Sequence, residues 1–224
     1  MFLLHGAGAS GLFWKPADGS GAEERLTTSE FVPESASVSP DGQTLAYSED
    51  RPGTGRDIWV VPLQGERKPR PFLQSRFTEV APTFSPDGRW LAYVSGESGR
   101  NEVYVQPFPG PGGKWLISTE GGADPVWARN GRELFYRNGD KMMAVDIQTQ
   151  PAFKAGTPRM LFERPAYTSG VGLAGTRRAD YDISPDGQRF LVIKQPEQQE
   201  TALTQINVVL NWFEELKRRV PAPQ

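Results

Sequence analysis

One pattern of apolar and polar positions recurs four times along this chain of 224 residues. Each copy has a short apolar segment, a polar turn and a second apolar segment. Proline presets φ in three of the turns, and the Asp-Gly or Asn-Gly that follows accepts the positive φ of a tight reversal. The pattern therefore predicts an antiparallel pair of strands in each copy. The copies are VSPDGQTLAYSE (38–49), FSPDGRWLAYVS (84–95), WARNGRELFYRN (127–138) and ISPDGQRFLVIK (183–194).

The spacing of the turns indicates the architecture. Successive turns, at Asp41, Asp87, Asn130 and Asp186, are 46, 43 and 56 residues apart. Further strand-like segments such as NEVYVQPF and KWLIST follow the turn within a unit. Periods in the forties with several strands per repeat are typical of propeller blades. We therefore expect an all-β protein, a β-propeller of about five four-stranded blades.

The units fill a single domain over residues 1–224. Residues 1–30 supply only the second, third and fourth strands of a unit, and the last unit is also incomplete. A short C-terminal helix is expected at FEELKRR, with Asn211 as its N-cap and Glu214 three residues later. The expected units are approximately 1–30, 31–77, 78–122, 123–167 and 168–220.

Composition excludes several classes of partner and site. Twenty-seven acidic and 25 basic residues give a net charge of −2, so we expect no nucleic-acid partner. The chain has no cysteine and a single histidine, which excludes disulfides, thiolate metal sites and multi-histidine metal sites. No segment reaches the roughly 20 apolar residues of a membrane span, and the N-terminus lacks the basic region of a signal peptide. We expect a soluble protein without membrane insertion, cytoplasmic as written.

The repeat SPDG…LAYVS…DIWVVPL resembles the WD40-like, TolB-type β-propeller repeat over residues 11–220. The end of the chain, INVVLNWFEELKRRVP, resembles the C-terminus of propeller domains fused to bacterial serine/threonine kinases or regulators. The resemblance implies six or more blades, so this chain is expected to be the C-terminal part of a longer propeller. It also implies that the parent domain can be extracytoplasmic. The sequence contains no kinase motif or DNA-binding helix pair, so neither activity is implied.

An incomplete propeller has a consequence for assembly. A closed ring protects its strand edges, whereas a truncated one exposes them. We expect either closure into a small five-bladed ring or a homodimer through the open blade edges, and we favour the homodimer.

Four acidic residues precede the first strands of successive units within about one residue of equivalent depth. In a propeller these positions converge on the mouth of the central channel. Six to eight oxygen ligands suit Ca²⁺, which could polarise an ester or lower the pKa of a bound water. No cofactor is required by the sequence, but Ca²⁺ could be held here; the competing interpretation is that these side chains are simply solvated. The candidate metal ligands are Glu34, Glu79, Asp124 and Asp180.

A long glycine-rich spacer precedes the fourth turn. It contains Tyr167 and Arg178, and either a ligand-binding loop or an ordinary surface excursion would have this composition. Tyr167 and Arg178 join the four acids as candidate ligand-binding residues, and Asp124, Asp180 and Arg178 are the catalytic candidates. His5 and Ser10 lack the supporting elements of a catalytic triad.

Three functional hypotheses follow. The favoured one is a module that binds a protein or small ligand, as a fragment of a larger sensory or regulatory protein. The alternative is a hydrolase of activated esters, lactones or phosphotriesters that uses a metal or carboxylates at the channel mouth. The third is a structural fragment without independent function. Fold class alone does not separate them, because propellers host both binding and catalysis.

Overall fold

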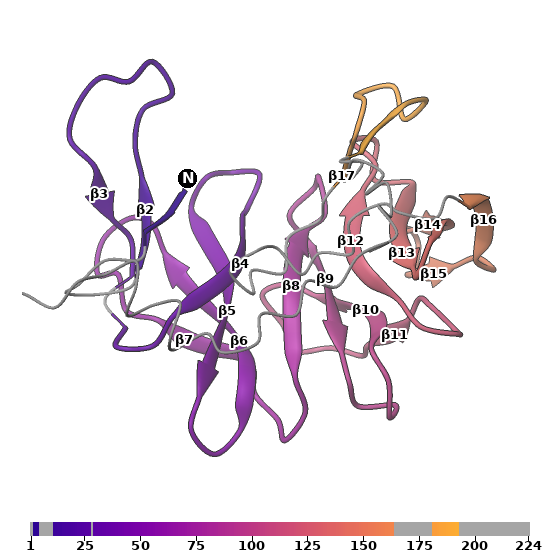
Figure 1. Cartoon of the computed structure of the whole chain (residues 1–224), viewed down its shortest axis with the longest axis horizontal. Coiled ribbons are helices and arrows are strands. Elements are labelled where there is room, and N and C mark those ends of the chain that lie inside the picture. Colours follow the sequence, from indigo (N-terminus) through magenta and orange to yellow (C-terminus); the bar gives the residue numbers. More distant parts are fainter. Residues whose placement is uncertain (1, 5–10, 28, 164–180, 193–224) are drawn as a thin grey trace, which may run out of the picture.

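The computed structural model describes residues 2–4, 11–27, 29–163 and 181–192, and every regular element in these ranges is a β-strand. The strands form successive antiparallel sheets, ordered along the chain as the blades of a propeller (Figure 1). The first sheet contains β1 (Phe2–Leu4), β2 (Gly11–Trp14) and β3 (Glu24–Arg25). The second contains β4 (Pro33–Val38), β5 (Thr44–Arg51), β6 (Gly55–Pro62) and β7 (Arg70–Leu73). The third contains β8 (Glu79–Phe84), β9 (Trp90–Ser95), β10 (Glu102–Pro107) and β11 (Trp115–Leu116).

The fourth sheet contains β12 (Ala123–Trp127), β13 (Glu133–Asn138), β14 (Lys141–Gln148), β15 (Lys154–Ala155) and β16 (Arg159–Glu163). Both β15 and β16 pair with β14, so they share the place of a fourth strand. The last described pair is β17 (Tyr181–Ile183) with β18 (Phe190–Val192). The all-β propeller of about five sheets is therefore confirmed. The predicted C-terminal helix lies outside the described residues.

The repeated turn forms through local hydrogen bonds of its own side chains. The Asp41 carboxylate accepts hydrogen bonds from the Ser39 hydroxyl (2.5 Å) and the Gln43 amide (3.0 Å), and the Ser39 hydroxyl accepts from the Thr44 amide (2.9 Å). Gly42 has φ 70°, which glycine adopts without steric cost. Bonds of the same kind occur in the other three turns, at Ser85 and Asp87, at Asn130, and at Ser184 and Asp186. The turns predicted from the repeat are thus present in the structure.

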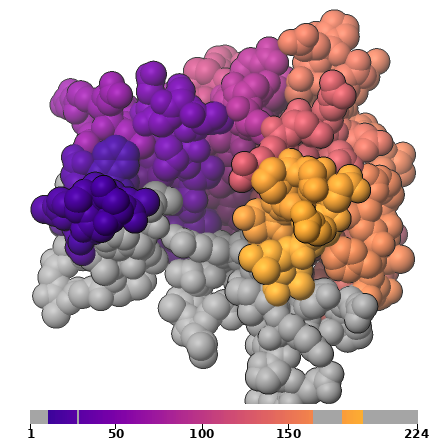
Figure 2. Space-filling model, turned by 90° about the horizontal axis from the view of Figure 1, so that it is seen from above, coloured from indigo at the N-terminus to yellow at the C-terminus, as the bar shows by residue number. Residues whose placement is uncertain are grey.

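The core consists of separate apolar layers between consecutive sheets. Each of the three complete sheets contributes a tyrosine from the repeat, Tyr47, Tyr93 or Tyr136, and all three are at most 1% exposed. Tyr47 packs with Leu12 of the first sheet, and Tyr93 packs with Val60 of the second. The innermost strands β4, β8 and β12 lie side by side. In Figure 2 the colours follow the chain across the molecule, from the indigo N-terminal segment on the left to the orange and golden segments on the right.

A β-bulge interrupts the first strand of each four-stranded unit. The register shifts between Pro33 and Ala36, between Val80 and Thr83, and between Ala123 and Val126. In the last two bulges a residue other than glycine has positive φ: Ala81 at 55° and Asp124 at 54°. The bulges therefore bend each first strand at the end where it begins.

Candidate functional site

The first strands begin at one end of the blades, together with the hairpin loops between the second and third strands. We call this end the mouth face, and the opposite end, which carries the Ser-Pro-Asp-Gly turns, the turn face. Antiparallel pairing produces this grouping, because the start of β4 lies opposite the end of β5 (Pro33 with Glu49). The start of β8 likewise lies opposite the end of β9 (Glu79 with Ser95). The acidic residues expected at the channel mouth belong to this face.

Glu34 lies at the surface of the second sheet and forms an ion pair. Its Oε1 is 2.8 Å from Nη2 of Arg56, and both side chains are largely covered, at 13% and 22% exposed. Arg56 comes from the start of β6, so the pair connects the first and third strands of the sheet. Glu34 also lines an open hollow on the mouth face, described below.

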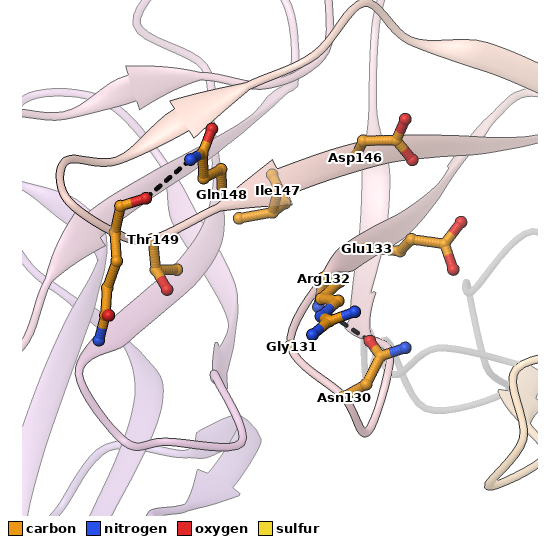
Figure 3. A pocket seen from close by; sticks show the side chains of 9 residues that line it. Asn130, Gly131, Arg132, Glu133, Asp146, Ile147, Gln148 and Thr149 are labelled. Carbon is orange, nitrogen blue, oxygen red and sulfur yellow. Dashed lines mark hydrogen bonds between the residues drawn. The ribbon is translucent and has the colours of Figure 1, made fainter.

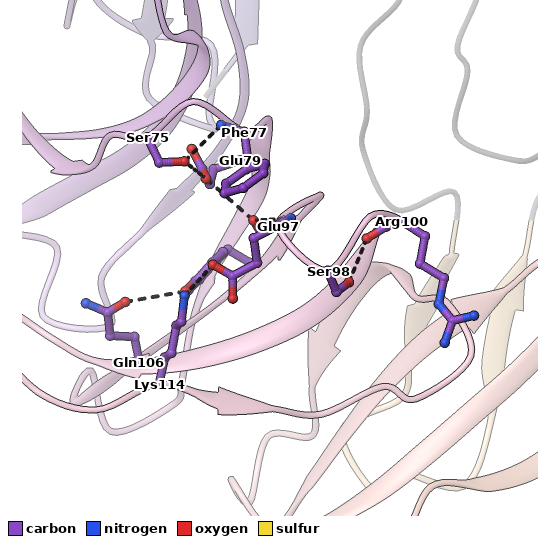
Figure 4. A network of polar contacts seen from close by, with 10 residues as sticks. Ser75, Phe77, Glu79, Glu97, Ser98, Arg100, Gln106 and Lys114 are labelled. Carbon is purple, nitrogen blue, oxygen red and sulfur yellow. Dashed lines mark hydrogen bonds and ion pairs between the residues drawn. The ribbon is translucent and has the colours of Figure 1, made fainter.

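Glu79 is buried, at 1% exposed, in the polar network drawn in Figure 4. Its Oε1 accepts a hydrogen bond of 2.6 Å from the Ser75 hydroxyl, and the Ser75 amide lies 3.3 Å from Asp57. Among the described residues its Oε2 has no hydrogen-bond partner. Burial raises the pKa of Glu79, the Ser75 hydrogen bond lowers it, and the charge of Asp57 raises it further, with a net shift upward. Glu79 is therefore a covered carboxylate that is costly to ionise.

Asp124 is also covered, at 7% exposed, and its main chain joins two sheets. The Tyr181 hydroxyl donates a hydrogen bond of 2.7 Å to the Asp124 carbonyl. Burial raises the pKa of Tyr181, and the negative charge of Asp124 adds to that shift. The positive φ of Asp124 recurs at Ala81, so this backbone conformation belongs to the repeated bulge and not to a catalytic role.

The three described acids do not form a metal-binding group. Within the described ranges, no set of three or more histidine, aspartate or glutamate residues lies close enough to hold a metal ion. The strand registers explain this. Glu79 occupies the same position in its sheet as Pro33 does in the second sheet, one residue before Glu34. Asp124 occupies the same position as Ala81, two residues further along the strand than Glu79. Successive residues of a strand point to opposite faces, so Glu34 and Glu79 face different ways, and Asp124 is separated from the Glu79 position by two residues at a bulge. These carboxylates therefore do not converge. The other candidates, Asp180, Arg178 and Tyr167, lie outside the described residues, as do His5 and Ser10, and sites that involve them stay predictions.

A hollow of about 520 Å³ lies on the mouth face of the second sheet. This volume is within the range of small-ligand pockets. We call it the Arg51 hollow, after the side chain that forms its wall. Its lining residues are Glu30, Phe31, Val32, Glu34, Asp50, Arg51 and Pro52.

Arg51 is held in a fixed position. Its guanidinium carbon lies 3.5 Å from the centre of the Trp59 ring and 5.5 Å from that of Phe31, and its Nε donates a 2.6 Å hydrogen bond to Glu49. Cation–aromatic contacts of this kind stabilise by about 0.5–2 kcal/mol. Tyr47, Glu49 and Arg51 alternate along β5 and therefore share a face, and Tyr47 lies directly opposite Trp59.

Three buried side chains behind Arg51 have unused polar atoms. In the described part of the chain, Glu49 Oε2, Tyr47 OH and Trp59 Nε1 have no hydrogen-bond partner. Glu49 and Tyr47 are fully buried, and Trp59 is 7% exposed. Burial and the neighbouring charge of Glu49 raise the pKa of Tyr47, so the phenol stays protonated at neutral pH. Sequence reasoning missed this group, although the replacement of the small Ser95 of one repeat by Glu49 in another was a visible signal.

Hollows on the turn face are more polar. One of about 650 Å³, shown in Figure 3, lies between the turn at Asn130 and the end of β14. Its polar groups serve local bonds: Asn130 Oδ1 accepts from the Arg132 amide (2.8 Å), Gln148 donates to the Gln150 carbonyl (2.8 Å), and Glu133 pairs with Arg159 (2.5 Å). These groups stabilise the sheet edge and leave few partners for a ligand.

Two other buried acids have structural roles. Asp57 accepts hydrogen bonds from Thr54 (2.6 Å) and Gln74 (3.2 Å). Glu102 accepts them from Arg100 (2.7 Å), the Gly121 amide (2.9 Å) and the Ser118 hydroxyl. Both therefore fasten the connection that follows the fourth strand of their sheet and leads to the next sheet.

No helix that could cross a membrane was found in the part of the chain that the structure describes. In sequence comparisons, no model of a known protein family matches the chain, and no functionally curated protein matches it.

Solved structures with the same fold are found. A protein assigned as TolB, from Agrobacterium tumefaciens, is 18% identical with a TM-score of 0.59, over 83% of this chain and 68% of that chain. TolB from Acinetobacter baumannii is 18% identical with a TM-score of 0.60, over 84% of this chain and 49% of that one. An oligogalacturonate lyase in complex with manganese is 13% identical with a TM-score of 0.57, over 80% and 52% of the two chains.

These likenesses confirm the TolB-type β-propeller fold that the repeat indicates. The chain spans about half the length of two of these proteins. At such low identity the likeness concerns the fold alone, and fusion to a kinase or regulator stays a prediction.

Proposed function

We propose that this propeller is a binding module that engages a protein or small-molecule ligand through its mouth face, at the Arg51 hollow. The observation that carries the proposal is the fixed Arg51 side chain, held between Glu49 and Trp59 at the wall of an open hollow. A side chain that is already ordered loses little conformational entropy when a partner binds. Arginine and aromatic residues are also the types that most often dominate binding energies.

The alternative, a metal-assisted or carboxylate-based hydrolase at the channel mouth, depends on Asp124, Asp180 and Arg178. A general acid or base must reach its substrate, and both Glu79 and Asp124 are covered. The TolB-type fold occurs in a lyase with manganese as well as in TolB, so fold likeness supports neither choice. A screen of p-nitrophenyl esters, a lactone and an aryl phosphotriester, each with Ca²⁺ and with EDTA, tests this alternative. Turnover that falls 10²-fold or more in Asp124→Ala would replace the binding proposal.

The binding proposal itself is tested by protein NMR. Isotope-labelled protein is titrated with a mixed library of small molecules and short peptides of positive, negative and zero charge. We expect the amide shifts of successful ligands to concentrate at residues 29–34 and 50–56. A library without any such ligand, or ligands that perturb only residues 130–133 and 146–150, would contradict the proposed site.

A further inference from the structure

We infer that the partner of the Arg51 hollow is a basic protein segment that presents an arginine or lysine beside an apolar side chain. This inference rests on the proposed function, because it names the chemistry of the partner at that same site. Three observations support it: the excess of carboxylates in and behind the hollow, the ion pairs that already occupy its two arginines, and the apolar surface between the carboxylates.

The hollow and its wall carry a formal excess of negative charge. The lining contributes the carboxylates of Glu30, Glu34 and Asp50, and Glu49 lies directly behind Arg51. Two guanidinium groups, those of Arg51 and Arg56, oppose these four carboxylates. The formal balance is therefore −2 at a site on a protein whose whole-chain balance is also −2.

The two arginines are already engaged. Arg51 binds Glu49, and Arg56 binds Glu34. Asp50 lies opposite Arg56 in the register of β5 and β6, yet no ion pair joins them, and none joins Glu30 to a cation, within the described ranges. The exposed Glu30, in the segment before β4, and the exposed Asp50, near the end of β5, thus present acceptors to solvent at the border of the hollow.

A buried group points to the same ligand chemistry. Glu49 is fully buried, and only its Oε1 is bonded, to Arg51. Its Oε2 has no partner among the described residues, so one arginine satisfies half of this carboxylate. A second cation held at the hollow would add a favourable interaction with a charge that is poorly screened by water. An anionic ligand would meet the opposite field.

The floor between the carboxylates is apolar. Val32 is 38% exposed, and Phe31 and Pro52 also line the hollow. An apolar side chain of the partner can cover this surface while its neighbour in sequence reaches Glu30 or Asp50. A hydrated metal ion or a simple polyamine would leave the apolar floor uncovered, so a protein segment fits the lining better than either.

The test uses three matched five-residue peptides with blocked ends, in which leucine is flanked by two arginines, two glutamines or two glutamates. Each is titrated into isotope-labelled protein at low salt. We expect the arginine peptide to shift the amides of residues 30–34 and 50–52 and to bind at least fivefold more tightly than the glutamine peptide. The glutamate peptide should bind most weakly, and the preference should shrink at 0.5 M NaCl because exposed charges are screened.

Two double variants distinguish binding at the hollow from non-specific attraction of the basic peptide to the acidic protein. E30Q/D50N removes two exposed carboxylates of the hollow and should weaken binding of the arginine peptide by about fivefold, because each exposed ion pair contributes only modestly. E66Q/D146N removes the same charge from exposed positions on the turn side and should leave binding unchanged. All four positions are exposed, and the thermal midpoints of both variants confirm that the fold is kept.

Equal binding of the arginine and glutamine peptides at the hollow would overturn the basic partner while leaving the binding module intact. Loss of binding in E66Q/D146N equal to that in E30Q/D50N would also overturn it, since the attraction would then be non-local. Absence of shifts with every peptide would overturn the inference, and the mixed-library titration would still decide the proposed function.

Discussion

At the scale of single residues, Glu79 and Glu102 make a natural comparison. Both are glutamates at the start of a strand in the third sheet, and they are 1% and 2% exposed. Glu102 is bonded through both oxygens, to Arg100 and Gly121 on one and to Ser118 on the other. Glu79 is bonded through Oε1, while its Oε2 has no partner among the described residues. The cost of burying the charge is therefore offset by hydrogen bonds to both oxygens at Glu102, but by bonds to only one oxygen at Glu79.

We predict that Glu79→Gln stabilises the protein at neutral pH, by about 1–2 kcal/mol, because a buried charge with incomplete hydrogen bonding is removed. The pKa of Glu79 is raised in the folded state, so at pH values between the unfolded and the folded pKa the folded protein holds a proton that the unfolded chain has lost. The free energy of unfolding then falls as the pH rises from the unfolded pKa through the folded one. The gain from Glu79→Gln should be largest above the folded pKa and should disappear near pH 4.

Urea unfolding at several pH values between 4 and 8 measures this difference. Glu102→Gln is the matched control and should destabilise the protein at pH 7, since it weakens three hydrogen bonds to a charged group. Equal destabilisation by both substitutions would show that Glu79 is well satisfied.

At the scale of elements, the bulge in β8 is held by an unfavourable backbone conformation. Ala81 has φ 55°, a left-handed conformation that costs a residue with a Cβ about 1–2 kcal/mol. Glycine avoids this cost but loses about 0.5–1 kcal/mol of chain entropy. We predict that Ala81→Gly raises the free energy of unfolding by about 0.5 kcal/mol, as measured by urea titration. Ala92→Gly, in the regular and fully buried part of β9, should lower it.

The turns and the strands next to them could be predicted because their causes are local. Asp41 bonds to residues two positions away, and Gly42 supplies its φ within the same four-residue turn. The bulge at Ala81 could not, because alanine has no preference for positive φ and the register across β8 and β9 imposes it. The Arg51 hollow depends on Trp59 and Phe31, which reach Arg51 only when a hairpin and a loop before it meet. The spacing of the repeats predicted where acidic residues precede the first strands. It could not predict the hydrogen bonds and ion pairs that Glu79 and Glu34 form in the folded protein.

At the scale of the whole molecule, β1 differs from its counterparts in the complete sheets. The strands β5, β9 and β13 are each paired on both sides, whereas β1 pairs only with β2 among the described residues. A strand with an unpaired edge is a template for pairing with another strand. We propose that two copies of this chain associate through the edge of β1, as expected for a propeller with open blades.

Light scattering after size exclusion should then give about twice the chain mass of 24.8 kDa, with dissociation on dilution. In a strand the amides of consecutive residues point to opposite sides, so of Leu3 and Leu4 one amide faces β2 and the other faces away. Proline lacks the amide hydrogen. One of Leu3→Pro and Leu4→Pro should therefore give a monomer of undiminished thermal stability, and the other should lower the stability by detaching β1 from β2. A wild-type protein that stays at the mass of one chain at every concentration, or two proline variants that both remain dimeric, would exclude association through this edge.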